Sequence, residues 1–207
     1  MTERMEDMKN GAILYLLIVL NVAGCNVRQQ NKNEVTREGV TVTTEQITNP
    51  QNFRYKKVTY ARDSEPYKEL GFLDNGNRLY EVYYARVDTE RIMTHIQYFP
   101  DGELSTVSVL DGNRLICRYV FYPNGKIQWR QHGLSNVGES WYADGMKQSI
   151  VEYAGLTPKR VTNWHHNGIM SEQSEWKNDQ RHGKWFQWDS LGNQTRKEFY
   201  AMGRLLQ

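Results

Sequence analysis

A glycine preceded by Asp or Asn recurs along this chain at nearly constant spacing, and this repeat constrains the fold more than any other feature. The stretch FYPNGKI at 121–127 returns as YFPDGEL, WYADGMK and WHHNGIM. Successive turn glycines lie 26, 23, 20, 23 and 24 residues apart: Gly76, Gly102, Gly125, Gly145, Gly168 and Gly192. Asn-Gly and Asp-Gly readily supply the positive φ angles of tight hairpin turns. Each copy therefore predicts two strands joined by a turn.

A second, less uniform set of turn signals lies between these copies, around Gly112, around Gly155, at 176–185 and at 200–205. The chain after residue 52 shows no long apolar pattern with the helical period of 3.6 residues. Apolar residues in 118–122 would point to both faces of a strand. We therefore expect the sheet to curl, so that parts of both its faces are covered. The sequence thus predicts an all-β fold, a repeat-built antiparallel meander of β-hairpins that forms an elongated, curled sheet.

The copy at 163–205 resembles the MORN-repeat variant of bacterial proteins. In that family a YY-x-NG-x-L hairpin is followed by Y-x-x-G-x-x-x-G-x-W, and six residues fall on the pattern: Trp164, Asn167, Gly168, Trp176, Gly183 and Trp185. Asn178 and Asp179 stand where the family more often has glycine. The resemblance implies a hairpin sheet with a role in binding or scaffolding, and many bacterial members are labelled antitoxin-like.

The N-terminal segment has the features of a secretory signal. Lys9 precedes an apolar run of nine residues at 12–20, which is shorter than the roughly 20 that a spanning helix needs. The residues Val-Ala-Gly-Cys at 22–25 resemble the lipobox of bacterial lipoproteins, which implies cleavage before Cys25 and lipidation of its thiol. Such an anchor would hold the protein on a membrane without spanning it. The alternatives are a plain secreted protein cut nearby, or a buried apolar helix with a chance cysteine.

Three segments follow from these signals. Residues 1–24 are predicted to be the lipoprotein signal peptide, 25–52 the lipidated cysteine with a flexible polar tether, and 53–207 the MORN-like repeat domain. In lipoproteins of Gram-negative bacteria an aspartate after the cysteine favours the inner membrane. Asn26 therefore favours the outer membrane of the cell envelope.

Motifs of catalysis and cofactor binding are missing from the sequence. It holds neither G-x-S-x-G nor G-x-G-x-x-G, and no Gly-Lys pair is followed by Ser or Thr. His165 and His166 would point to opposite faces of a strand, so they would not chelate one ion together. We predict no catalytic residue, no metal site and no cofactor. After removal of residues 1–24, 24 basic and 21 acidic residues remain, a balance that argues against nucleic acid as a partner.

All six tryptophans lie between Trp129 and Trp188. One interpretation is that they fill the interior of a thin sheet. The other is that Trp141, Trp164 and Trp188 line a groove for a protein, a peptide or a glycan. We therefore expect a membrane-anchored, non-catalytic binding or scaffold module with a protein partner. The alternatives are an antitoxin or immunity protein that neutralises a toxin, and an envelope hydrolase with an unrecognised site, for which loss of hydrolysis on mutating a histidine such as His166 would be the test.

Overall fold

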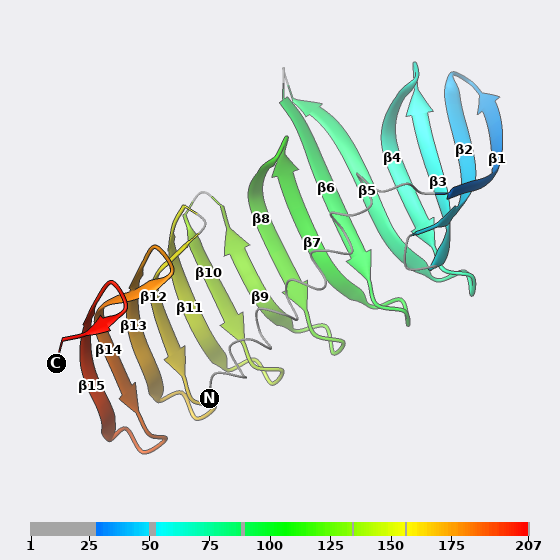
Figure 1. The fold of residues 1–207 in the computed structure, drawn as a ribbon. Coiled ribbons are helices and arrows are strands. Elements are labelled where there is room, and N and C mark those ends of the chain that lie inside the picture. The colour runs from blue at the N-terminus through cyan, green and yellow to red at the C-terminus, as the bar shows by residue number, and fades with distance from the viewer. Residues whose placement is uncertain (1–27, 50–52, 88–89, 134, 156, 207) are drawn as a thin grey trace. The chain divides into compact units, whose positions relative to one another are not determined.

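The computed structural model describes residues 28–49, 53–87, 90–133, 135–155 and 157–206. These residues form sixteen β-strands and no helix (Figure 1). The chain divides into two compact units, Met1–Arg78 and Leu79–Gln207, and within each unit strands that follow one another in the chain pair antiparallel. The all-β, antiparallel meander of hairpins predicted from the sequence is confirmed.

The first unit holds two hairpins, formed by β1 (Arg28–Arg37), β2 (Val40–Thr48), β3 (Arg54–Arg62) and β4 (Glu65–Phe72). Both residues of each hairpin turn have positive φ angles, at Glu38–Gly39 and at Asp63–Ser64. This is the backbone geometry of the primed two-residue turns whose twist matches paired strands. Among the described residues of this unit, the buried apolar side chains are Ile47, Tyr55 and Leu70.

Residues 28–48, which we predicted to be part of a flexible tether, instead form the β1–β2 hairpin. The run of Val and Thr at 40–44 explains the difference, because β-branched residues favour strands even in a polar segment. Thr36 and Thr41 face each other across the hairpin, and their hydroxyl groups are hydrogen-bonded at 3.0 Å. The proposed signal peptide at 1–24 and the lipidated Cys25 lie outside the described residues, so they remain predictions.

The second unit continues the same hairpin pattern. Its strands are β5 (Arg78–Val87), β6 (Glu90–Tyr98), β7 (Leu104–Asp111), β8 (Arg114–Phe121), β9 (Ile127–His132), β10 (Val137–Trp141), β11 (Lys147–Ala154), β12 (Thr157–Trp164), β13 (Met170–Lys177), β14 (Gln180–Trp188), β15 (Gln194–Ala201) and β16 (Arg204–Leu205). Their order in the sheet is their order in the chain. Few of the described side chains of this unit are buried, and Val82 and Trp185 are the apolar ones among them.

The six glycine turns form where the repeat predicted them. In the copy at 121–127 the Tyr122 N–H donates to the carbonyl of Lys126 at 2.8 Å, and the Gly125 N–H donates back to the carbonyl of Tyr122 at 2.9 Å. The other five turns contain the same two bonds, and all six glycines have φ between +77° and +99°. A side chain with a Cβ is strained at such angles, which explains why the repeat keeps glycine there.

In five of the six turns the side chain of the residue before the glycine acts as a local hydrogen-bond acceptor. In the third copy Asn124 Oδ1 accepts from the N–H of Lys126 at 3.1 Å, and Asn or Asp does the same in the first five turns. The sixth copy has Leu191 at that position. There Asp189 takes over, and its Oδ1 accepts from the N–H groups of Leu191 and Asn193, each at 2.9 Å. The carboxylate of Asp189, two positions earlier, thus supplies the side-chain acceptor that the least regular turn would otherwise lack.

Candidate binding surface

The pairing register places Trp141, Trp164 and Trp188 on one face of the second unit. Directly paired residues of neighbouring strands share a face, and so do residues two apart in one strand. One such row of paired residues runs across five strands: Glu139, Ile150, Thr162, Gln173 and Phe186. Each of the three tryptophans lies two residues after a member of that row. The structure therefore brings the three predicted site residues together as a set, which we call the tryptophan row.

The tryptophan row has regular spacing because its members occupy alternate strands, at the ends of β10, β12 and β14. Neighbouring strands lie about 4.8 Å apart, so successive members are separated by roughly 10 Å. The pairing of each strand with the next strand along the chain or the one before it shifts register immediately before each tryptophan. The same shift occurs before Tyr98 and Phe121, which hold the corresponding position in earlier repeat copies. All three side chains of the row are half-buried. Part of each indole ring is therefore available to a partner.

Each tryptophan of the row is fixed by the turn of the preceding repeat copy. The hydroxyl of Tyr122 donates to the carbonyl of Trp141, and that of Tyr142 donates to the carbonyl of Trp164, both at 2.9 Å. In the next copy His165 Nε2 donates to the carbonyl of Trp188 at 2.8 Å. Burial raises the pKa of Tyr122, which keeps this donor protonated. These bonds tie adjacent hairpins together and hold the backbone of the row in register.

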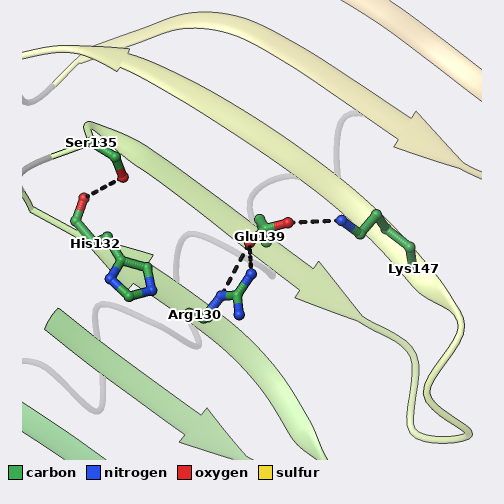
Figure 2. Close-up of polar contacts among 5 residues, drawn as sticks. All are labelled: Arg130, His132, Ser135, Glu139 and Lys147. Carbon is green, nitrogen blue, oxygen red and sulfur yellow. Dashed lines mark hydrogen bonds and ion pairs between the residues drawn. The ribbon is translucent and has the colours of Figure 1, made fainter.

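A charged cluster of Arg130, Glu139 and Lys147, shown in Figure 2, lies beside the first member of the row. Glu139 lies between two cations: its Oε2 accepts from Nε of Arg130 at 3.1 Å and also from Nη2, and its Oε1 lies 2.7 Å from Nζ of Lys147. Both cations also lie over the ring of Trp141, at 5.3 and 5.5 Å from its centroid. The bonds from Lys147, and next those from Arg130, lower the pKa of Glu139. Sequence analysis missed this cluster, because its members meet only through the register of β9, β10 and β11.

Ser135 and His132 lie near this cluster but do not form a hydrolase-like relay (Figure 2). The hydroxyl of Ser135 donates to the backbone carbonyl of His132 at 3.2 Å and not to its imidazole. That imidazole packs edge-on against Tyr119, with ring centroids 5.9 Å apart. A nucleophilic serine needs a base at its hydroxyl. In this geometry His132 offers its backbone carbonyl, and not its imidazole, to Ser135.

Trp129 and Trp185 have a different role, because they lie on the face opposite the tryptophan row. Trp185 is only 8% exposed and is stacked between two guanidinium groups, with Cζ of Arg181 3.5 Å and Cζ of Arg196 4.3 Å from its ring centroid. The ring of Trp129 covers Gly138, where a Cβ would come within 2.2 Å of the indole. These two tryptophans fit the space-filling interpretation. Five of the six tryptophans thus divide between structural packing and the row, and the sixth, Trp176, donates its indole N–H to Oγ of Ser174 at 2.9 Å.

His165 and His166 lie at a turn and have separate partners. His165 bonds to Trp188, whereas Nε2 of His166 lies 3.0 Å from Oδ2 of Asp144. Among the described residues no group of three or more His, Cys, Asp or Glu side chains is arranged to hold a metal ion. Within the same residues, no helix has the length and apolar character needed to cross a membrane.

Comparisons with known proteins add little to this geometry. No protein-family model and no curated protein sequence matches the chain. Among solved structures, the crystal structure of TarM is similar over 86% of this chain, with 12% identity and a TM-score of 0.26. The match covers 27% of the TarM chain, so this protein spans about a quarter of its length. A TM-score of this size carries no argument about fold or function.

Proposed function

We propose that this protein is a membrane-anchored, non-catalytic binding module whose tryptophan row contacts a protein partner. One observation carries the proposal: Trp141, Trp164 and Trp188 lie half-buried on one face at regular spacing. Tryptophan is enriched among the residues that dominate binding energy at protein interfaces. A row held in register by hydrogen bonds from its neighbours loses little conformational freedom on binding, which favours affinity.

The anchor is the lipidated thiol of Cys25, with the repeat domain displayed at the bacterial cell envelope and most simply at the outer membrane. The lipobox resemblance at 22–25 supports this location. Two or three acyl chains would make the association with the bilayer nearly permanent. The partner is then a protein that is accessible from the membrane surface.

An affinity pull-down from detergent-solubilised envelopes tests the proposal. The bait is the full chain, as wild type, Trp164→Ala or Trp188→Ala, each checked for folding by circular dichroism. We expect a partner that wild type retains and both variants lose. Leu191→Ala is the matched control, because it removes an apolar side chain that is 82% exposed in a turn outside the row. The proposal fails if the folded tryptophan variants retain every protein that the wild type and the control retain.

A further inference from the structure

A groove opens where two neighbouring hairpins of the second unit diverge. Strands β12 and β13 pair from Trp164 with Met170 as far as Arg160 with Glu175, and both strands continue beyond that last pair. Pro158 lies in the diverging part of β12, and it has no N–H with which to extend the ladder. The resulting groove has a volume of about 400 Å³. This is within the range of about 300–1,000 Å³ that is typical of ligand sites.

The groove combines apolar surface with uncompensated positive charge. Ala154, Pro158 and the indole of Trp176 supply the apolar part. Lys159 and Lys177 are exposed at the groove, and neither makes an ion pair with another described residue. The lining is therefore cationic beside an aromatic ring.

The one carboxylate of the groove already has partners within the sheet. Glu175 Oε1 lies 4.0 Å from Nη2 of Arg160, and Oε2 accepts from the backbone N–H of Lys184 at 3.1 Å. Arg160 is in turn shared with Glu152 at 3.2 Å. These contacts leave the two lysines as the free charges of the groove.

His182 adds a hydrogen-bond donor to the lining. Its Nδ1 accepts from the backbone N–H of Met202 at 3.4 Å, so the proton of the neutral ring is on Nε2. Two ammonium groups, an N–H donor and an indole ring fit carboxylate side chains interspersed with apolar ones. They do not fit a basic ligand.

We propose that this groove binds an acidic peptide segment of the partner protein. The assignment rests on the proposed function and names the chemistry of one part of the partner. Charge complementarity selects acidic residues, and Trp176 with Pro158 provides an apolar contact for a neighbouring side chain. The tryptophan row and the groove then recognise two different features of the same partner.

Fluorescence anisotropy tests the proposal directly, with the full chain in a non-ionic detergent. The probe is a short fluorescein-labelled peptide of Glu, Asp and Tyr, and the control probe carries Lys at every acidic position. We expect saturable binding of the acidic probe that weakens as salt is raised, and no binding of the basic probe. The Lys159→Glu, Lys177→Glu double variant should bind the acidic probe about tenfold more weakly or worse, because like charges oppose each other in the groove.

Lys197→Glu is the matched control, since it reverses an exposed lysine on β15 outside the groove. Its affinity should equal that of wild type, and the unfolding midpoints of all variants should agree. The assignment fails if the acidic probe does not bind, if Lys197→Glu weakens it equally, or if phosphatidylglycerol vesicles bind through Lys159 and Lys177 while no peptide does. If the pull-down partner depends on Trp164 but not on these two lysines, the groove assignment alone is overturned and the proposed function stands.

Discussion

Replacing Gly183 by Ala should destabilise the protein more than the same change at an ordinary turn glycine. Gly183 lies in β14 with φ of +87°, an angle that costs an L-residue about 1–2 kcal/mol. A Cβ at this position would also come within 2.1 Å of Oε2 of Glu175. That oxygen accepts the backbone N–H of Lys184, so the carboxylate would have to leave a bond it makes in the native sheet.

The two effects can be estimated separately. Loss of the hydrogen bond to Glu175 adds about 0.5–1.5 kcal/mol to the backbone strain. Gly183→Ala should therefore lower the free energy of unfolding by about 1.5–3.5 kcal/mol. Gly203→Ala is the matched control, because Gly203 has φ of +80° but its Cβ would meet nothing closer than 3.9 Å. That variant should lose about 1–2 kcal/mol, the strain alone.

Urea unfolding followed by tryptophan fluorescence measures both losses. In a Glu175→Gly background both the carboxylate and the Cβ of residue 175, which would lie 3.2 Å from a Cβ at position 183, are gone. Gly183→Ala should then cost no more than Gly203→Ala. Equal losses for the two glycine variants in the wild-type background would refute the steric part of this reasoning. An unchanged cost of Gly183→Ala after removal of Glu175 would refute it as well.

Further predictions concern the charged cluster, one turn, the bonds between hairpins and the anchor. The pKa of Glu139 is lowered in the folded state, so its carboxylate adds stability above the ordinary carboxyl range and loses it as pH falls through the lowered pKa. In Glu139→Gln the free energy of unfolding, measured by urea titration, should therefore fall less steeply than in wild type between neutral pH and about pH 3. An equally steep fall with pH in both proteins would contradict this. Asp179→Gly should raise the free energy of unfolding by about 0.5–1 kcal/mol, because Asp179 has φ of +59° in a two-residue turn; a lower urea midpoint would count against it. Tyr142→Phe should lower the free energy of unfolding by about 0.5–1.5 kcal/mol, because it removes the donor to the carbonyl of Trp164; thermal melts that coincide with wild type would show this bond to be dispensable. Cys25→Ser should release the protein from membranes in a fractionation assay, and continued membrane association would show that something else holds it.

The local turn chemistry of this fold could be predicted from the sequence. Asn-Gly and Asp-Gly set backbone angles by themselves, so the six glycine turns were found without knowledge of the rest of the chain. Even the irregular copy at Gly192 forms the same turn, although the acceptor there is Asp189 and not the residue before glycine. The strands follow from these turns, because neighbouring hairpins in a meander pair in chain order.

Features that depend on register could not be predicted. The hairpin at 28–48 was missed because its polar composition resembles a tether, whereas its Val and Thr residues pair in β1 and β2. The contacts of Glu139 join residues eight and nine positions apart, and a shift of one residue would move them to opposite faces. The groove beside Trp176 arises where a ladder ends, which no local motif marks. The shared face of the tryptophan row likewise depends on the pairing of Glu139, Ile150, Thr162, Gln173 and Phe186 across five strands.

Photo-crosslinking from opposite faces of the sheet tests the central claim, that the face of the tryptophan row binds a protein. Trp164→p-benzoylphenylalanine places the probe in the row. Arg196→p-benzoylphenylalanine places it on the other face and outside the groove, since the exposed Arg196 pairs with Gln187, the neighbour of Trp188 in β14. Illumination of whole envelopes should give a crosslinked protein from position 164 and none from position 196. Equal crosslinking from both positions, or crosslinking from 196 alone, would contradict the account.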